Sequence, residues 1–347
     1  MKALVLDGFG AMSVHERQKP VAGPDELMVE IVATGICGSD IHGFTGENGR
    51  RVPGQVMGHE TVGVVAECGS ETGRFGFTVG DVVTFNPVVI PAEQSAEFAG
   101  REQHCPDKYV IGVAHHVVAA FAQFVAVPAR NIVALDAGMP IEYGALIEPI
   151  AVGVHAVRRA AVGPGLSVLI IGGGPIGQSV ILAARMEGAT DIVVSEVDPG
   201  RRALCERLGA RTLDPADGPL PDQVKALLGG PAAVAIDAVG IGVTVAGALE
   251  SVRLGGTVCL VGMGAPRIDL NAFSVSTEER SLVGSFTYSA KDFRDAARFV
   301  SSAPPEVAEL ISRRVPLADA PQAFTDLAAG DGTAGKVLVL LNDRAET

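Results

Sequence analysis

The 347-residue sequence has no tryptophan and few aromatic residues, and it lacks any run of basic side chains. Its 40 acidic residues outnumber its 27 basic ones, for a formal net charge of −13. Nucleic acid and anionic membrane surfaces are therefore poor partners. Long apolar runs are also missing, because the hydrophobic windows are strand-length and broken by Gly, Pro or charge. We therefore expect no membrane-spanning helix.

The sequence is also poor in cysteine. The five cysteines form no close pairs, and an odd number so widely spread does not indicate a disulfide framework; they are Cys37, Cys68, Cys105, Cys205 and Cys259. The first seven residues read as an edge strand and lack the apolar stretch and cleavage site of a signal peptide. We therefore expect a protein of the reducing cytoplasm.

The residues that are present predict an α/β protein of two domains. The length favours two domains, and 48% hydrophobic residues with 43 glycines indicate a packed core with many tight turns. Up to about residue 150, short β-rich runs such as 26–32 and 62–66 are split by Gly and Pro, which is typical of a β-barrel-like domain. The polar stretch between residues 87 and 106 reads as a surface loop.

From Ser167 onward, apolar strands alternate with helical patterns, which predicts βαβ units and a doubly wound parallel sheet. The expected strands are 167–171, 191–196, 233–238, 256–262 and 281–285. Helices are expected at 176–187 and 201–208. After about residue 290 the pattern loosens, and 336–341 reads as a final strand.

A dinucleotide site is predicted where the first of these strands ends. The strand runs into a G-x-G-x-x-G turn and then a helix, over the residues Gly172, Gly173, Gly174, Pro175, Ile176 and Gly177. The first glycine permits the tight turn, the second lets the backbone approach a pyrophosphate, and the last lets the helix pack on the strand. The helix N-terminus supplies amide donors and a positive dipole end.

An acid and two arginines bear on the choice of dinucleotide. Glu196 ends the second strand about 20 residues after the glycine turn, as binding of the adenosine ribose requires. Its carboxylate repels a 2′-phosphate, so we expect NAD rather than NADP. We interpret Arg201 as a ribose or adenine-edge contact and Arg202 as solvated.

Two segments of the first domain concentrate zinc-type ligands. One contains Cys37, Ser39 and His42, and the other is His59 followed directly by Glu60. Thiolate and imidazole suit a catalytic zinc, yet a lone Cys or His is more often an ordinary buried side chain. On an extended strand His59 and Glu60 point to opposite faces, so ligation by both requires a bend. Glu148, near the predicted domain junction, is another carboxylate candidate.

With these residues in view, the chain resembles the zinc-containing medium-chain dehydrogenases, most closely the sorbitol (polyol) and L-threonine dehydrogenase branch. Six segments carry the resemblance along nearly the whole chain: C-G-S-D-I-H at 37–42, G-H-E-x-x-G at 58–63, V-G-D-V-V at 79–83, I-E-P-I-A-V-G-V-H-A at 147–156, G-G-G-P-I-G at 172–177 and G-K-V-L-V at 335–339. The resemblance implies a GroES-like catalytic domain over 1–152, completed by about 290–347, and a Rossmann NAD-binding domain over 153–289. It also implies a homodimer or homotetramer.

The resemblance also implies roles for individual residues. Cys37, His59 and Glu60 look like the ligands of a catalytic zinc. Glu148 would bond the zinc-bound water or replace Glu60 as a ligand. Ser39 looks like the hydroxyl that takes the substrate proton, which His42 would pass outward.

The departures from the family pattern matter as well. Many relatives carry four close cysteines for a structural zinc, whereas the corresponding stretch here offers Cys105 alone, so we predict one catalytic zinc per subunit and no structural zinc. Polyol dehydrogenases often place an arginine beside a pocket tyrosine. Here Thr287 stands at the arginine's place before Tyr288, which argues against sorbitol itself.

The sequence thus predicts a zinc- and NAD-dependent enzyme that oxidises a polyol, sugar or sugar-derived secondary alcohol to a ketone. An amino alcohol of the L-threonine type is the alternative substrate. A zinc-free reductase of quinones or alkenes, or a non-catalytic binding protein, fits less well because neither requires an open zinc ligand set.

Overall fold

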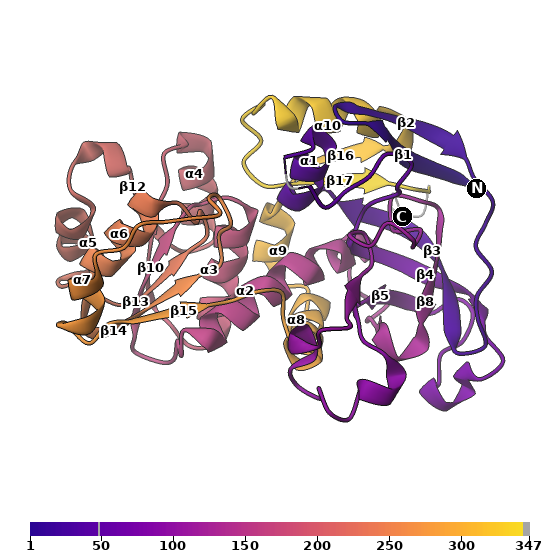
Figure 1. Cartoon of the computed structure of the whole chain (residues 1–347), viewed down its shortest axis with the longest axis horizontal. Helices are drawn as coiled ribbons and strands as arrows, with labels where there is room; N and C mark the ends of the chain where they lie inside the picture. Colours follow the sequence, from indigo (N-terminus) through magenta and orange to yellow (C-terminus); the bar gives the residue numbers. More distant parts are fainter. Residues whose placement is uncertain (48, 343–347) are drawn as a thin grey trace. The chain divides into compact units, whose positions relative to one another are not determined.

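The computed structural model describes residues 1–47 and 49–342. The chain divides into two compact units, the first made of residues 1–148 and 289–347 and the second of residues 149–288. Elements from both units are labelled in Figure 1. Among the described helices, none is both long and apolar enough to cross a membrane.

A seven-stranded sheet forms the frame of the first unit. It takes strands from both ends of the chain, in the order β16 (Ile311–Pro316), β17 (Lys336–Leu340), β3 (Glu26–Gly35), β4 (Glu60–Cys68), β5 (Val82–Phe85) and β9 (Ile132–Ala134), with β8 (Phe124–Pro128) also paired to β3. Strand β17 runs parallel to β16 and antiparallel to β3, so the predicted final strand forms and lies beside the first long strand.

Two separate two-stranded antiparallel sheets complete the described strands of this unit. They are β1 (Lys2–Gly8) with β2 (Ala11–Glu16) and β6 (Val88–Val89) with β7 (Tyr109–Val110). The predicted surface loop at 87–106 is therefore wrong at its ends, because Val88, Val89, Ile90 and Cys105 are buried in the core. The run of three apolar residues at 88–90 was too short to stand out against the polar stretch that follows it.

Most helices of the first unit come from its C-terminal segment, residues 289–347. The helices of this unit are α1 (Gly38–Thr45), the start of α2 (Ile147–Arg159), α8 (Ala290–Ser301), α9 (Pro305–Glu309) and α10 (Ala320–Ala328). The pattern after residue 290 is more regular than expected. Helix α8 buries one face and is capped by Ser289, whose Oγ accepts a hydrogen bond from the Asp292 amide.

The second unit is built on a six-stranded parallel sheet. Its order is β12 (Arg211–Leu213), β11 (Asp191–Ser195), β10 (Ser167–Ile171), β13 (Ala232–Asp237), β14 (Val252–Leu260) and β15 (Ser281–Gly284). In chain order this is 3-2-1-4-5-6, the doubly wound arrangement that places a ligand crevice at the carboxyl ends of the strands beside β10. The predicted α/β class and parallel sheet are confirmed.

Helices connect these strands and cover the sheet. They are α3 (Pro175–Met186), α4 (Pro199–Arg207), α5 (Leu220–Leu228), α6 (Gly242–Ser251) and α7 (Ala272–Ser276), and Figure 1 shows α5 and α6 on one side of the sheet and α3 on the other. Strand β14 begins four residues earlier than predicted, directly after α6, with a register shift against β13 between Ala232 and Val234. Gly255 and Gly256 concealed this first part of the strand.

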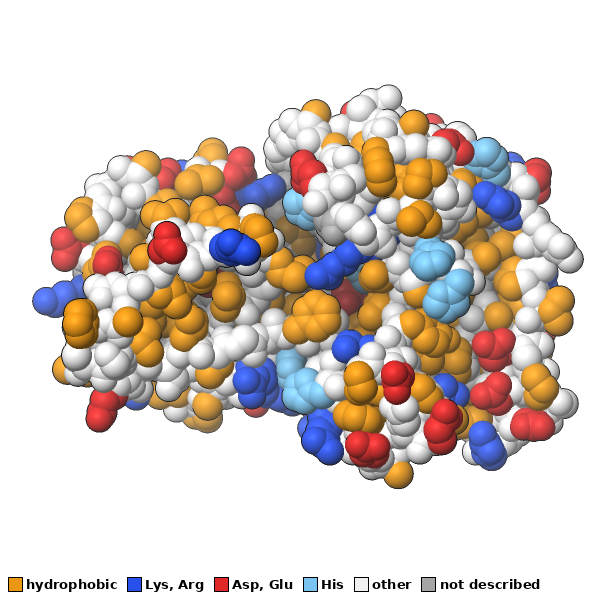
Figure 2. Space-filling model, in the orientation of Figure 1, with side chains coloured by type: hydrophobic (Ala, Val, Ile, Leu, Met, Phe, Trp, Pro, Cys, Tyr) orange, Lys and Arg blue, Asp and Glu red, His pale blue; other side chains and the backbone are white. Residues whose placement is uncertain are grey.

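Short 3₁₀ turns join the larger elements. They cover Thr72–Phe75, Ala92–Gln94, Glu102–His104, Ala129–Asn131, Ile141–Leu146, Pro215–Asp217 and Leu317–Asp319. On the face of the molecule that Figure 2 presents, lysine and arginine side chains lie among acidic ones.

Candidate metal centre and dinucleotide site

The end of β3 places Cys37 at the start of α1. Cys37 is the N-cap residue, and its backbone amide donates a hydrogen bond of 3.2 Å to Asp40 Oδ2. The Ser39 hydroxyl donates to the Cys37 sulfur at 3.4 Å. The first turn of the helix thus fixes a half-buried thiol with a hydroxyl beside it.

A left-handed glycine places His59 and Glu60 at the start of β4. Gly58 has φ of +99°, and a Cβ there would lie 2.8 Å from the Phe121 amide nitrogen, so the chain turns sharply just before the strand begins at Glu60. His59 therefore lies outside the extended strand, so the alternation of faces expected for two adjacent strand residues does not apply to His59 and Glu60. Among the described residues, ligand atoms of Cys37, His59 and Glu60 all lie within 4.8 Å of one another.

Buried charges surround His59. Its Nδ1 lies 3.7 Å from Asp40 Oδ1, and the guanidinium of Arg51 approaches the same oxygen at 3.5 Å. Burial by itself lowers the pKa of His59, but the negative charges of Asp40, Cys37 and Glu148 outweigh it and raise the pKa well above its usual value. The negative groups around His59 therefore favour a positive charge at its imidazole.

A lysine from the C-terminal strand also enters this site. Lys336, the first residue of β17, is buried and forms an ion pair with Glu60 Oε1. Burial lowers the pKa of Lys336, but the charges of Glu60, Cys37 and Glu148 outweigh this effect and raise the pKa above its usual value. The ammonium therefore stays charged. The sequence motif G-K-V-L-V contains this lysine, but its spacing from Glu60 along the chain gave no sign of the contact.

Glu148 lies near the cluster without joining it. It is buried in the first turn of α2, and its charge contributes to raising the pKa of both His59 and Lys336. Its carboxylate is nevertheless outside the group of three residues whose ligand atoms gather within 4.8 Å.

The residues present fit a divalent metal ion. Sulfur, imidazole nitrogen and carboxylate oxygen are the donors that zinc prefers. One carboxylate oxygen of this group, Glu60 Oε2, is buried without a hydrogen-bond partner, a costly condition that a metal bond to this oxygen would relieve.

Ser39 and His42 lie three residues apart on α1, which places them on neighbouring positions of one helix face. Ser39 is half-buried beside the sulfur, whereas His42 is exposed. His42 Nδ1 lies 2.9 Å from Glu47 Oε2, a partner that the sequence analysis did not identify.

The glycine turn of the second unit matches the geometry expected of a dinucleotide site. Gly172 has φ of +94°, and a Cβ at Gly177 would collide with the Gly172 carbonyl oxygen. Gly174, the N-cap of α3, has open space where its Cβ would be, and Pro175 and Ile176 form the first helical turn. Gly172 and Gly177 are thus required by the fold, while Gly174 leaves space for a ligand.

Glu196 lies at the carboxyl end of β11, one residue beyond the strand. Its Oε2 accepts a hydrogen bond from the Gly173 amide at 2.7 Å, and its Oε1 accepts one from the Asp198 amide at 2.8 Å. The carboxylate is buried and fixed against the glycine turn. Backbone pairing of this kind leaves further acceptor capacity on both oxygens.

The two arginines of α4 behave differently from one another. The backbone amide of Arg201 donates to the N-cap Asp198, and its Nε is buried without a hydrogen-bond partner. The prediction that Arg202 is solvated is wrong. Its guanidinium donates to the carbonyl of Glu196 at 2.7 Å and to Asp214 at 2.8 Å, so it holds the ends of β11 and β12 together.

Hydrogen bonds hold the lobe around Cys105. Cys105 is buried, and its thiol donates to Gln94 Oε1 at 2.9 Å, while Gln94 donates to Asp107 at 2.7 Å. Glu102 of the same lobe accepts a hydrogen bond of 2.9 Å from the Ala290 amide at the start of α8. Hydrogen bonds of single side chains thus hold this lobe, residues 94–107, in place.

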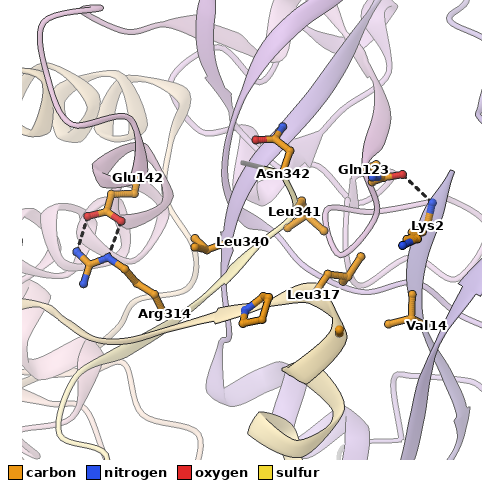
Figure 3. Close-up of a pocket in the computed structure, with 11 residues that line it drawn as sticks. Lys2, Val14, Gln123, Glu142, Arg314, Leu317, Leu340, Leu341 and Asn342 are labelled. Carbon is orange, nitrogen blue, oxygen red and sulfur yellow. Dashed lines mark hydrogen bonds and ion pairs between the residues drawn. The ribbon is translucent and has the colours of Figure 1, made fainter. Parts of the chain in front are cut away.

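A separate cavity of about 830 Å³ lies in the first unit and is drawn in Figure 3. Its lining includes Leu317, Leu340 and Leu341, together with Glu142 and Arg314, which form an ion pair. None of the site residues predicted from the sequence lines this cavity.

Comparison with known proteins identifies the family. Residues 175–302 match the family described as zinc-binding dehydrogenase, and residues 23–137 match the alcohol dehydrogenase GroES-like domain. The chain belongs to the zinc-binding dehydrogenase family. The resemblance inferred from the sequence motifs is thereby confirmed, as are the class of enzyme and the combination of a GroES-like with a Rossmann-type fold.

This zinc-binding dehydrogenase is similar to named enzymes over almost its whole length. It is 31% identical over 341 residues to D-xylulose reductase A of Aspergillus niger, covering 95% of this chain and 94% of the relative. It is 33% identical over 352 residues to sorbitol dehydrogenase 1 of Saccharomyces cerevisiae, covering 97% of each.

A solved structure of the same family gives a match of similar extent. It is a protein of Sinorhizobium meliloti 1021, described as a zinc-binding dehydrogenase bound to NADP. The two are 32% identical, with a TM-score of 0.88 and coverage of 98% of this chain and 99% of the other.

Proposed function

We propose that this zinc-binding dehydrogenase uses one zinc ion and NAD to oxidise a polar secondary alcohol, namely a polyol, sugar or sugar-derived alcohol, to a ketone. The observation that carries the proposal is the gathering of Cys37, His59 and Glu60 ligand atoms within 4.8 Å in a largely buried site. We assign this metal site to the GroES-like catalytic domain and the dinucleotide site to the Rossmann domain. For these domains we keep the limits predicted from the sequence, which are 1–152 with about 290–347 and 153–289.

The chain's own side chains account for proton movement and orientation. Zinc bound by Cys37, His59 and Glu60 would supply Lewis acidity toward an alcohol oxygen. Ser39, whose hydroxyl already lies beside the Cys37 sulfur, accepts the substrate proton. His42 carries it outward from an exposed position, and Glu47 orients the imidazole through its Nδ1. Glu148 adds negative charge to the site and is the alternative carboxylate ligand.

The cofactor assignment rests on Glu196. A 2′-phosphate would bring about two negative charges against a buried carboxylate, which costs several kcal/mol and therefore at least about a hundredfold in affinity. Arg202 is engaged with Asp214 and backbone carbonyls and does not offset this repulsion. Arg201 remains the side chain that would contact the adenosine ribose or adenine edge.

The substrate class rests on the relatives and on two residues of the second unit. D-xylulose and sorbitol appear in the names of the similar enzymes. Tyr288 is fully buried, and Thr287 is held at φ of +49°, an unusual conformation for a β-branched residue. Because Thr287 stands where polyol dehydrogenases often have an arginine, we favour a polyol or sugar alcohol other than sorbitol.

A substrate panel read by NADH absorbance tests the proposal. The panel contains pentitols, hexitols, sugar acids, L-threonine and simple secondary alcohols at matched concentration. We expect the highest kcat/KM with a polyol or sugar-derived alcohol, and none of this activity after zinc is removed. A preference for L-threonine would establish the amino-alcohol alternative, and equal activity without metal would refute the zinc mechanism.

The cofactor assignment has its own measurement. We expect kcat/KM with NAD to exceed that with NADP by about a hundredfold on any accepted alcohol, from the like-charge repulsion at Glu196. Equal or better use of NADP would show that Arg201 outweighs the carboxylate.

A further inference from the structure

Lys336 connects the C-terminal strand to the candidate metal centre. It lies 276 residues from Glu60 in sequence, yet its ammonium forms an ion pair with Glu60 Oε1. The same ammonium lies 3.4 Å from the carbonyl oxygen of Ile36, the residue before Cys37. Both side chains of the pair are almost completely buried, at 4% exposure for Lys336 and 0% for Glu60.

Strand pairing fixes the position of this lysine. Gly35 at the end of β3 is the partner of Glu60 on β4, and it is also the partner of Leu338 on β17. The Ile36 amide donates to the Val337 carbonyl at 2.9 Å. Strand β3 therefore ends, and strands β4 and β17 begin, at the same end of the sheet, next to Cys37. Lys336 is the first residue of β17, the strand that the C-terminal segment contributes.

The two oxygens of Glu60 are in different environments. Oε1 is occupied by the ammonium, whereas Oε2 is buried without a hydrogen-bond partner. A Cβ at Gly35 would collide with Oε2, so the glycine leaves the room in which this oxygen lies. Ligand atoms of Glu60, Cys37 and His59 gather within 4.8 Å, and Oε2 is the Glu60 oxygen that has no partner in the protein.

We propose that Lys336 is a positioning residue for the metal site: by holding Oε1 of Glu60, it leaves Oε2 as the single oxygen that Glu60 presents to the metal. The inference rests on the proposed function, because it takes Cys37, His59 and Glu60 as the ligand set. Partners of metal-bound carboxylates orient the ligand, and their loss typically lowers metal affinity about 10–100-fold. Lys336 fills this role from the opposite end of the chain.

Replacing Lys336 by Met tests the inference on the holoenzyme. Zinc affinity is measured by competition with a chelator, and the site is also examined by the visible spectrum of the cobalt-substituted protein. We expect Lys336→Met to bind zinc about 10–100-fold more weakly than wild type and to change the cobalt spectrum. The matched control is Lys19→Met, which removes a surface Lys–Glu pair with Glu67 in the same unit. We expect that control to leave both readouts unchanged.

A double-mutant cycle shows whether Lys336 acts through Glu60. Glu60→Gln is expected to weaken zinc binding on its own. Adding Lys336→Met to Glu60→Gln should then cause less than about a twofold further loss. An equal loss from Lys336→Met in both backgrounds would assign the lysine a general electrostatic or structural role and overturn the inference.

Lys336→Arg separates position from charge and remains informative if Lys336→Met fails to fold. A guanidinium keeps the positive charge but tends to hold both oxygens of a carboxylate. We therefore expect Lys336→Arg to lose zinc affinity at least tenfold and to shift the cobalt spectrum. Wild-type affinity and spectrum in Lys336→Arg would reduce the lysine to a point charge and overturn the inference.

The wild-type protein separates the two levels of the argument. Zinc bound by wild type but held equally well by Lys336→Met defeats the inference and leaves the proposed function intact. Failure of wild type to bind zinc at all defeats the proposed metal site itself.

Discussion

The side chains of Ser39 and His42 define the expected proton path from the metal centre. Ser39 is half-buried beside the Cys37 sulfur, and His42 is exposed one turn later on α1. Ser39→Ala should lower kcat by about a hundredfold or more, the usual effect of losing acid–base assistance. His42→Ala should cost less, because water can replace an exposed group at the end of the path. Steady-state kinetics of the two variants checks the order.

Glu47 provides the control for this path. It contacts His42 Nδ1 from the exposed side of the helix, so Glu47→Gln should change kcat by less than His42→Ala does. A larger loss in His42→Ala than in Ser39→Ala would contradict the proposed order of proton transfer.

Thiol reactivity gives a second prediction at the residue scale. Burial raises the pKa of Cys259 to about 12. Burial, with the charges of Glu196 and Glu206, does the same for Cys205. At pH 8 about one such thiol in ten thousand is ionised, so neither should react with a disulfide reagent. Exposed Cys68 should react quickly and fully buried Cys105 should not, which predicts one fast-reacting thiol in the native zinc protein.

Metal removal should change this count. Half-buried Cys37 is protected while it binds zinc, so a chelator should raise the number of fast-reacting thiols from one to two. Cys68→Ser should remove the first and leave the second. Two reactive thiols before chelation would show that Cys37 is not a metal ligand.

The βα turn at the start of α3 gives a prediction at the scale of a structural element. Gly174 has open space at its Cβ position, whereas a Cβ at Gly177 would meet the Gly172 carbonyl. Gly174→Ala should keep the melting temperature but weaken NADH binding about tenfold or more, because the methyl group occupies the approach of the pyrophosphate. Gly177→Ala should lower the melting temperature as well. Calorimetry and NADH fluorescence titration separate the two effects.

Gly163→Ala is the matched control for the glycine turn. Gly163 precedes the same strand β10 at its opposite end, and its Cβ position is also open. This variant should change neither melting temperature nor NADH affinity. Tight NADH binding by Gly174→Ala would argue against a cofactor at this turn.

Local patterns predicted five of the six strands of the second unit, because buried parallel strands form continuous apolar runs, and missed the three-residue strand β12. Strand β14 was predicted to begin late because Gly255 and Gly256 interrupt such a run. Helix α8 was missed because charged residues interrupt its apolar face. It also makes a contact distant in sequence, from the Ala290 amide to Glu102.

Contacts between distant parts of the sequence limited how much of the candidate site could be predicted. The gathering of Cys37, His59 and Glu60 was expected from two short motifs and from the family resemblance that these motifs carry. The roles of Lys336 and Arg202 were not, because each contacts groups brought close only by strand pairing. A basic residue beside an apolar strand reads as solvated until the buried carboxylate or carbonyl opposite it is known.

At the scale of the whole molecule, the two kinds of site belong to different units. The candidate metal ligands lie in the unit of residues 1–148 and 289–347, and the glycine turn lies in the unit of residues 149–288. Loss of a metal ligand should therefore leave dinucleotide binding intact. The cytoplasmic location and the dimeric or tetrameric state stay predictions from the sequence.

The zinc content of the purified protein, measured by elemental analysis in wild type and in His59→Ala, tests the central claim most directly. Removing one of three protein ligands should abolish tight metal binding. The account predicts one zinc per wild-type chain and none in His59→Ala after dialysis, although the variant still binds NADH with wild-type affinity. Two tightly held zinc ions per wild-type chain, or a full zinc ion retained by His59→Ala, would contradict it.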